Sequence, residues 1–258
     1  MMEKKYKLTE ETIAINGKPL YRIEALKDFN DVKKGDKGGF IENESNLSQS
    51  DDCWVYDDAM VYGDAAVYHN ARVYGNARVY GDASVFGNVK VSDNAEVYGN
   101  AKVYGNAEVY ANAEVYGIAQ IFGNAIVYGD ARVYGNAKVY GNAEIDDNAI
   151  VYGNAEICGD ARVYDDVKVR DNAVVFGNAE ICGDAVITSK SDYILFKNWW
   201  SSGRHFTWTR SNNMWKVGCF YGTGKELIEK AYKDSEMSGE EYERVVKYVE
   251  AILKANKL

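Results

Sequence analysis

Residues 61–90 read VYGDAA VYHNAR VYGNAR VYGDAS VFGNVK, five consecutive copies of one six-residue pattern. The pattern starts at Val55 and runs without an insertion to Ile187, which gives 22 full repeats. The first position is always Val or Ile, and the fifth is Ala in all but two repeats. The fourth is Asn or Asp in all but one, and the third is Gly in 15 of the 22. A branched aliphatic residue every sixth position, followed by a small one, is typical of a coil with short strands as sides and tight corners.

Each column of the repeat has a physical interpretation. The Val or Ile side chain points inward, and Ala fits a crowded corner. Gly followed by Asn or Asp forms the corner, because these residues adopt a positive φ at the least cost. Alternation along a strand then turns the second and sixth positions outward. We predict that residues 55–188 form one parallel β-solenoid with a continuous core.

The pattern resembles the hexapeptide repeat of left-handed β-helix proteins, in which three hexapeptides make one triangular coil. The resemblance implies a mainly β fold, a single-stranded parallel left-handed β-helix of about seven coils. The handedness comes from the resemblance alone, since a period of six does not determine it and most crossover connections are right-handed.

Residues 18 apart stack above one another in such a coil, so the outward side chains fall into columns on three faces. The second face presents Tyr68, Phe86, Tyr104, Phe122, Tyr140, Cys158 and Phe176. The third presents Tyr56, Tyr74, Ser92, Tyr110, Tyr128, Asp146, Tyr164 and Cys182. The first face presents an unbroken column of Tyr62, Tyr80, Tyr98, Tyr116, Tyr134 and Tyr152.

The unbroken tyrosine column is the predicted subunit contact, because a large contiguous aromatic surface is typical of an interface. Alternatively, the stacked rings only shield the strands and stabilise their packing. Resemblance to the superfamily implies a homo-oligomer, with a trimer favoured.

The two ends depart from the repeat. Residues 1–54 are predicted to form an N-terminal β cap: a hairpin turning at Asn16-Gly17, then a degenerate first coil with Ile41 and Leu47 six residues apart. Residues 189–258 form the C-terminal α+β module. We predict three strands near 193–198, 204–210 and 214–221. Two helices follow, with capping boxes at Thr223/Glu226 and Ser238/Glu241.

Composition narrows the cellular setting. A net charge of −9 argues against binding to duplex nucleic acid. No run of 18 apolar residues is present and the chain starts with charged residues, so we expect no membrane association and a cytoplasmic location. The four cysteines lie far apart with no CxxC pair, which predicts free thiols rather than disulfides or a zinc site.

Few residues are candidates for catalysis. Acyltransferases that this repeat resembles use a His in the cleft between neighbouring prisms, and the chain has only His69 and His205. His69 stands at a corner and is the one candidate catalyst, although a turn residue with positive φ is the competing interpretation. Two His are too few for the zinc-dependent carbonic anhydrases on this fold. Corner carboxylates are interpreted as turn caps, so we expect no metal and no cofactor.

The C-terminal module holds the densest group of candidate binding residues. Aromatic rings beside arginines are able to stack a planar base and pair its phosphate. The competing interpretation is that a small subdomain needs these rings for its own core. The predicted ligand- or partner-binding residues are Trp199, Trp200, Arg204, His205, Trp208, Arg210, Asn212 and Trp215.

Three stretches resemble phage and prophage hexapeptide-repeat proteins: GGFIENESNLS (38–48), CWVYDDA (53–59) and FTWTRSNNMWKVGCFYGTGKELIEKAY (206–232). Several of those relatives carry a transferase label inherited from the fold, without established catalytic residues. The resemblance implies a bacterial host cytoplasm.

Three functions remain open at this point. The leading hypothesis is a non-catalytic, self-associating phage-type binding or scaffold protein. Such a protein would be directed at the host, by sequestering a small nucleotide signal or blocking a defence protein. The first alternative is an acyltransferase with an acyl-CoA donor. The second is a structural virion component.

Overall fold

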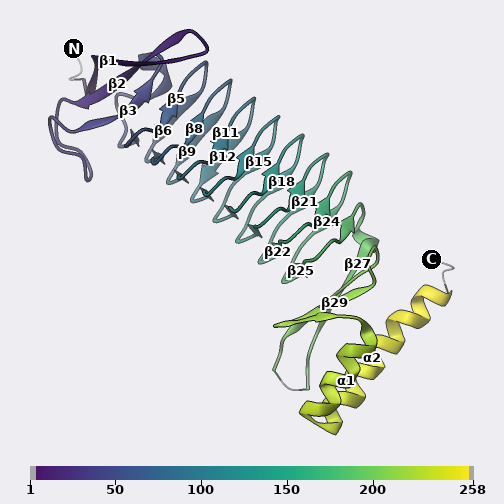
Figure 1. Ribbon diagram of the computed structural model, residues 1–258. Coiled ribbons are helices and arrows are strands. Elements are labelled where there is room, and N and C mark those ends of the chain that lie inside the picture. The colour runs from purple at the N-terminus through teal and green to yellow at the C-terminus, as the bar shows by residue number, and fades with distance from the viewer. Residues whose placement is uncertain (1–3, 201, 256–258) are drawn as a thin grey trace.

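A computed structural model describes residues 4–200 and 202–255, and its centre is a straight solenoid of stacked coils (Figure 1). Each coil contributes one short strand to each of three parallel faces. A small antiparallel sheet and two helices follow the last coil. The predicted fold class, a mainly β solenoid with an α+β module at its C-terminal end, is confirmed.

The solenoid strands of the three faces are short, because each side of the coil is spanned by one hexapeptide. Face 1 contains β5 (Met60–Val61), β8 (Arg78–Val79), β11 (Glu96–Val97), β14 (Glu114–Val115), β17 (Arg132–Val133), β20 (Ile150–Val151), β23 (Lys168–Val169) and β26 (Val186–Ile187). Face 2 contains β6 (Ala66–His69), β9 (Ser84–Gly87), β12 (Lys102–Gly105), β15 (Gln120–Ile121), β18 (Lys138–Val139), β21 (Glu156–Ile157) and β24 (Val174–Val175). Face 3 contains β4 (Trp54–Val55), β7 (Arg72–Val73), β10 (Lys90–Val91), β13 (Glu108–Val109), β16 (Ile126–Val127), β19 (Glu144–Ile145), β22 (Arg162–Val163) and β25 (Glu180–Ile181).

The register is the one that the repeat predicts. Val79 pairs with Val97, which in turn pairs with Val115, so residues 18 apart occupy the same place in successive coils. First- and fifth-position side chains are fully buried along the whole solenoid. The core is continuous from Tyr6 in the N-terminal cap to Tyr193 after the last coil. Burial of branched aliphatic residues in every coil is therefore the main stabilising contribution.

The corners turn at the third position of the repeat. All 22 third-position residues have a positive φ, including the non-glycine residues His69 (59°) and Asp93 (60°). Glycine is favoured there for a second reason, the closeness of the next corner. A Cβ on Gly87 would lie 2.6 Å from the carbonyl oxygen of Gly105.

The fourth position does not adopt a positive φ, which corrects the prediction that Gly and Asn share the corner conformation. Asparagine is used there because its amide bonds to the same position of the next coil. One such ladder runs from Asn70 through Asn88, Asn106, Asn124 and Asn142 to Asp160, with N···O distances of 2.8–3.0 Å. Asparagine suits this role because one side chain both donates and accepts.

The N-terminal cap extends face 1 beyond the first coil. β1 (Tyr6–Ile15) and β2 (Lys18–Ala25) form a hairpin at Asn16-Gly17, and β3 (Lys37–Ile41) pairs antiparallel with β2 and parallel with β5. The 3-10 helix Glu44–Asn46 follows, and Leu47 then bridges to Val67 on face 2. The degenerate first coil therefore supplies a floor for the solenoid and covers its open end.

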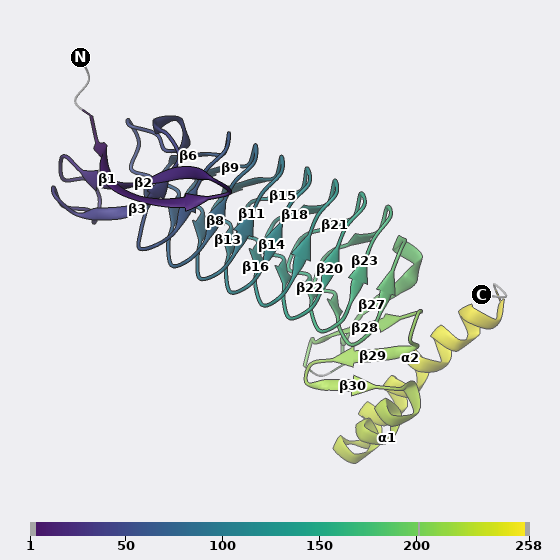
Figure 2. The ribbon, with the colours of Figure 1, turned by 45° about the horizontal axis from the view of Figure 1, so that its top comes forward.

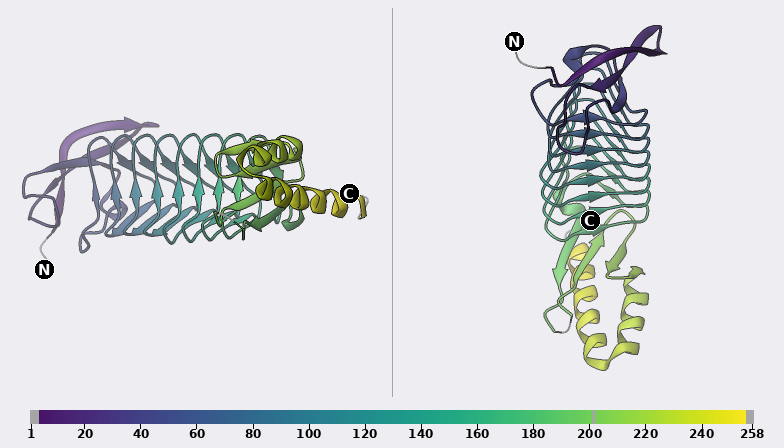
Figure 3. Two further views of the ribbon diagram at one scale, coloured as in Figure 1. Left: turned by 90° about the horizontal axis from the view of Figure 1, so that it is seen from below. Right: turned by 90° about the vertical axis from the view of Figure 1, so that its left-hand side faces the viewer.

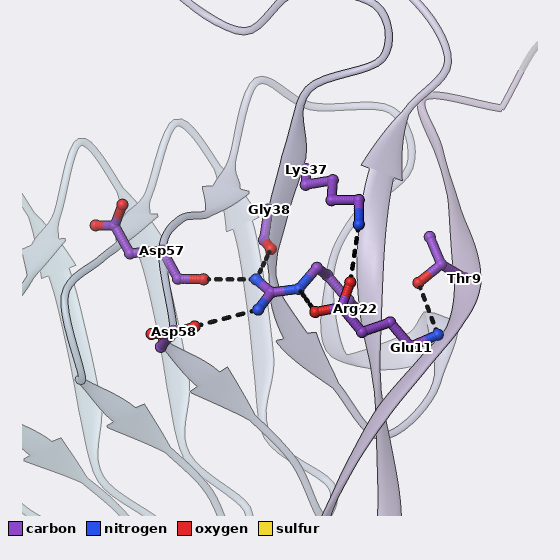
Figure 4. Close-up of polar contacts among 7 residues, drawn as sticks. All are labelled: Thr9, Glu11, Arg22, Lys37, Gly38, Asp57 and Asp58. Carbon is purple, nitrogen blue, oxygen red and sulfur yellow. Dashed lines mark hydrogen bonds and ion pairs between the residues drawn. The ribbon is translucent and has the colours of Figure 1, made fainter.

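One arginine attaches the hairpin to the solenoid (Figure 4). The guanidinium of Arg22 donates to the carboxylate of Glu11 at 2.6 Å and to the carbonyl oxygens of Gly38 at 2.9 Å and Asp57 at 3.0 Å. It also donates to the Asp58 carboxylate at 3.2 Å and lies 4.1 Å from the centre of the Phe40 ring. Bonds to β1, β3 and the first repeat thus meet in one side chain.

The C-terminal module is a four-stranded antiparallel sheet with two helices on one side (Figure 2). Its strands are β27 (Tyr193–Lys197), β28 (His205–Thr209), β29 (Met214–Val217) and β30 (Phe220–Gly222), preceded by the 3-10 helix Lys190–Asp192. The third predicted strand is in fact two strands, because Gly218 (φ 55°) reverses the chain between them.

The helices are α1 (Gly224–Asp234) and α2 (Glu236–Ala255). The capping box of Thr223 and Glu226 is confirmed. The second predicted box is wrong, since Ser238 lies inside α2 and its backbone N–H donates to the Ser235 hydroxyl at 3.1 Å. Figure 3 places the hairpin and the helices at opposite ends of the solenoid. Neither described helix is long and apolar enough to cross a membrane.

Candidate functional site

The outward aromatic side chains of face 1 form one stacked column. We call it the tyrosine wall and define it as Tyr62, Tyr80, Tyr98, Tyr116, Tyr134 and Tyr152. Neighbouring ring centroids lie 4.8–5.1 Å apart and the ring planes differ by 7° or less. The predicted stacking of this column is confirmed. Each of these tyrosines is half-buried.

Two of the phenol groups donate hydrogen bonds to neighbouring carboxylates. Tyr80 donates to the Glu96 carboxylate at 2.8 Å, and Tyr98 donates to Glu114 at 3.1 Å. Burial, and then the hydrogen bond to a carboxylate, raises the pKa of both tyrosines above its ordinary value. Tyr80 and Tyr98 are therefore uncharged at neutral pH, and Arg78 and Glu96 form an ion pair beside them (3.2 Å).

Face 2 carries a shorter wall of Tyr68, Phe86, Tyr104, Phe122 and Tyr140, with the same ring spacing of 4.8–5.1 Å. Cys158 ends it. Stacked rings occur on two adjacent faces, so stacking alone does not show whether a wall is a subunit contact or only shields its strands. Equivalent substitutions in the two walls therefore serve as controls for each other.

The predicted C-terminal binding residues do not form one site. Trp208 and Trp215 are 1% and 2% exposed and pack with Phe206 and the two helices. The Trp208 indole N–H donates to the amide oxygen of Asn213 at 2.9 Å. These two rings belong to the core of the module and are unavailable for stacking on a ligand.

The remaining members are dispersed. Trp199 is 79% exposed, and Trp200 packs edge-on against Phe206 and Tyr242. His205 pairs with Lys197 at the end of the β27–β28 ladder, and Arg204 is exposed. Arg210 lies 4.0 Å from the Asp192 carboxylate, and the Asn212 amide donates to Asp184. Trp199 and Arg204 are exposed, and Trp200, His205, Arg210 and Asn212 are half-buried.

His69 stands on an exposed corner as predicted. Its backbone N–H donates to the Asp51 carboxylate at 3.0 Å, and its ring is edge-on to Tyr68 at 5.0 Å. A shallow cleft of about 490 Å³ beside it is lined by Ser50, Asp51, Asp52, His69, Asn70, Gly87 and Asn88. No hydrogen bond joins the imidazole to another side chain in the part of the chain that the structure describes, so its orientation is set by ring contacts alone.

The corner carboxylates cap backbone amides. Asp57, Asp93 and Asp165 each accept from the backbone N–H of the corresponding residue in the next coil, at 3.0, 3.0 and 2.7 Å. Within residues 4–200 and 202–255, no group of three or more His, Cys, Asp and Glu side chains is arranged to hold a metal ion.

A cleft that the sequence did not predict lies on face 3, where the turn between β29 and β30 overhangs the last coils. Its volume is about 530 Å³, and the lining includes Tyr128, Asp146 and Tyr164 from the third-face column, with Arg162, Glu144, Glu180, Lys216 and Cys219 around them. The repeat predicts the column of outward side chains on face 3, but the overhanging turn belongs to the C-terminal module, which has no repeat.

The charged side chains around this cleft are arranged in ion pairs. Arg162 lies 2.9 Å from Glu144, and Lys216 lies 3.8 Å from Glu180 and 5.7 Å from the centre of the Tyr164 ring. Burial and a hydrogen bond to Asp146 raise the pKa of Tyr128 to about 12. Burial also raises the pKa of the Cys182 thiol to about 11, so this thiol is protonated at neutral pH.

Comparison with known proteins supports the architecture. The YdcK β-solenoid repeat model matches residues 71–87 and 119–135. The protein named "Uncharacterized acetyltransferase YdcK" from Escherichia coli (strain K12) is 39% identical over 61 residues, which are 20% of this chain. The match spans 19% of the length of that relative, so it reports on the repeat and not on a complete protein.

Proposed function

We propose that this protein is a non-catalytic scaffold that associates with copies of itself through the tyrosine wall of face 1. The wall is a continuous column of stacked aromatic rings, a property that favours burial between subunits. Aromatic side chains are enriched at such interfaces because they bury much area at a low entropic cost. A trimer is the assembly implied by the resemblance to hexapeptide-repeat proteins.

The caps favour lateral association over stacking of prisms end to end. The hairpin and first coil cover one end of the core, and the C-terminal sheet covers the other. The covered ends separate the apolar core of the solenoid from any prism that would stack on it. A structural virion filament is therefore the less favoured alternative, and electron microscopy of the purified protein distinguishes filaments from discrete particles.

The experiment compares Tyr116→Arg on face 1 with Tyr104→Arg on face 2. Both substitutions insert a charge in a stacked wall and perturb the solenoid similarly. We expect the wild-type protein to be oligomeric by analytical ultracentrifugation. Tyr116→Arg should weaken association by about tenfold or more, and Tyr104→Arg should leave it unchanged. A monomeric wild type, or equal effects of both variants, would contradict the proposal.

A second candidate function is acyl transfer from coenzyme A to an amino group, which is supported by the name of the Escherichia coli relative. His69 would remove the proton from the attacking amine beside the corner cleft, and the thiol of coenzyme A would leave as the amide forms. Calorimetry with acetyl-coenzyme A tests this function. Binding with turnover that disappears in His69→Ala but not in His205→Ala would support it, and no binding would end it.

The narrower role of a phage protein directed against its host rests on the resemblance of the end segments to phage and prophage proteins. In this role the protein would sequester a small nucleotide signal or bind and block a defence protein of the host. Native mass spectrometry of the protein purified from its natural host tests it, because stoichiometry and any retained molecule are measured together. A homogeneous oligomer without added mass would argue against it.

A further inference from the structure

We propose that the gap at Asp146 in the face 3 column is a binding site for one planar heteroaromatic group that carries N–H donors and no negative charge. The ligand would take the place of the missing ring in the stack. The site lies on a different face from the tyrosine wall, so the inference stands apart from the proposed self-association.

The gap is set by the register of the solenoid. Val127 pairs with Ile145, and Ile145 with Val163, so residue 146 lies one coil from both Tyr128 and Tyr164. In the unbroken walls each coil adds one ring at a spacing of 4.8–5.1 Å. A ring above Asp146 would therefore stand at the ordinary stacking distance from a tyrosine on each side.

Within the described ranges, neither flanking ring stacks on another ring on the side of the gap. The Tyr128 hydroxyl accepts a hydrogen bond from Arg162. Tyr128 stacks on Tyr110 at 5.0 Å through one face only, and the other side is followed by Asp146. Among the described residues, Tyr164 has no stacked ring partner, and its aromatic ring is instead contacted by Lys216. Stacking on aromatic side chains typically stabilises a bound base by about 1–3 kcal/mol.

Asp146 does not fill the space that a ring would occupy. Its carboxylate turns back to its own corner and accepts the backbone N–H of Asp147 at 2.6 Å. It also accepts from the Tyr128 hydroxyl. The resulting cleft of about 530 Å³ lies within the range of roughly 300–1,000 Å³ typical of small-molecule sites.

The charges around the cleft select the kind of ligand. Both cations are already neutralised, Arg162 by Glu144 and Lys216 by Glu180. In the described part of the protein, the carboxylate of Asp146 forms no ion pair. The three carboxylates and two cations of the lining therefore leave one net negative charge. Carboxylates accept N–H donors, so the site favours a neutral or cationic amino-substituted ring and disfavours a phosphate or carboxylate group.

The test uses two planar tricyclic probes that differ in charge. Proflavine is a cation with two amino groups, and anthracene-9-carboxylate is an anion. We expect proflavine to bind the full-length protein with one site per chain by calorimetry, and anthracene-9-carboxylate to bind about tenfold more weakly or not at all. Equal binding of the two probes would overturn the proposal.

Asp146→Tyr restores the missing ring and serves as the decisive variant. It should lower proflavine affinity by about tenfold or more, because the new side chain occupies the gap. Ser92→Tyr fills the other interruption of the same column and is the matched control, with binding unchanged. Retained binding in Asp146→Tyr, or the same loss in Ser92→Tyr, would contradict the assignment.

Asp146→Asn keeps the shape of the side chain and removes its charge. This second variant tests the proposal if Asp146→Tyr does not fold. Proflavine affinity should fall by several-fold, up to about tenfold, while the circular dichroism spectrum stays that of the wild type. Unchanged affinity would show that the carboxylate does not select the ligand. Tyr116→Arg should bind proflavine normally, so failure of the scaffold proposal and failure of this one are distinguishable.

Discussion

The fourth position of the repeat is chosen for a side chain that bonds in both directions along the solenoid. Asn106 accepts from the Asn88 amide at 2.9 Å and donates to the Asn124 oxygen at 3.0 Å. The sequence predicted that Asn belongs at this column, but attributed it to the corner conformation. The amide ladder becomes visible only when residues 18 apart are placed side by side, since no two of its members are close in sequence.

The ladder predicts that Asn and Asp are not equivalent at every coil. Asn106→Asp removes a donor in mid-ladder, and one hydrogen bond is lost however the neighbouring amides rotate. We expect a loss of about 0.5–1 kcal/mol in the free energy of unfolding, measured by chemical denaturation.

Asp160→Asn is the control for this substitution. Asp160 accepts from Asn142 at 2.8 Å and from Asn178 at 3.3 Å, so it ends two ladder segments that point toward each other. An asparagine there keeps the number of bonds after the Asn178 amide rotates, and stability should not change. An equal loss of unfolding free energy in the two variants would show that the direction of the hydrogen bonds along the ladder does not affect stability.

The tyrosines predict how the fold responds to alkaline pH. Burial and hydrogen bonds raise the pKa of Tyr128 from 10.0 to about 12, and a hydrogen bond to Cys158 together with burial raises that of Tyr140 to about 12. Between these values the unfolded chain binds fewer protons than the folded one, so stability falls as pH rises. The contribution is complete below pH 10 and is lost on passing about pH 12.

Phenolate absorbance and circular dichroism, followed together, check this expectation. Tyrosine ionisation should lag behind that of free tyrosine and coincide with loss of β structure. Ionisation of all tyrosines near pH 10 with an unchanged fold would contradict it.

At the scale of elements, the end pieces are where sequence patterns were least informative. The predicted capping box at Ser238 obeys the sequence rule, yet α2 begins at Glu236 because the Ser235 hydroxyl three residues earlier accepts the Ser238 N–H. The strand predicted for 214–221 contains a glycine turn that separates β29 from β30. Local sequence patterns are compatible with either start of the helix and with either one strand or two. The tertiary packing of the module selects between them.

The attachment of the cap predicts an uneven response to two substitutions. Arg22→Ala removes the side chain on which bonds from β1, β3 and the first repeat converge, and it leaves the Gly38 and Asp57 carbonyl oxygens without this donor (Figure 4). We expect a loss of about 2 kcal/mol, concentrated in the hairpin and measured by hydrogen exchange of β1 and β2 amides.

Lys37→Ala is the matched control, because Lys37 pairs with the same Glu11 at 2.9 Å and its side chain is 62% exposed. Its loss should cost less than about 1 kcal/mol. Faster exchange spread over the whole solenoid in Arg22→Ala, rather than over the hairpin, would show that the cap and coils unfold as one unit.

At the scale of the whole molecule, the solenoid is a stack in which each coil contacts only its neighbours. Such arrays tolerate the loss of a complete unit but not of a fraction. Deleting residues 98–115 removes 18 residues, joins Val97 to Tyr116, and keeps every column in line. We expect a folded protein with a cooperative thermal transition at a lower midpoint than that of the wild type.

Deleting residues 98–106 tests whether the solenoid also tolerates the loss of a fraction of a coil. Nine residues are one and a half repeats, so the first-position aliphatics after the junction would fall on the wrong phase of the coil. This variant should lose β circular dichroism and aggregate. A folded nine-residue deletion would mean that the period does not fix the register.

A strict period of six fixes the place of each residue by its position modulo 18, so the solenoid, its register and its stacked outward rings follow from the residue pattern alone. Where that period stops, the outcome is visible only in the folded structure. It placed Trp208 and Trp215 in a core, divided the predicted binding cluster, and laid the β29–β30 turn over the gap at Asp146. The β29–β30 turn and Asp146 are about 70 residues apart, and no period relates the residues of the C-terminal module to one another or to the repeat.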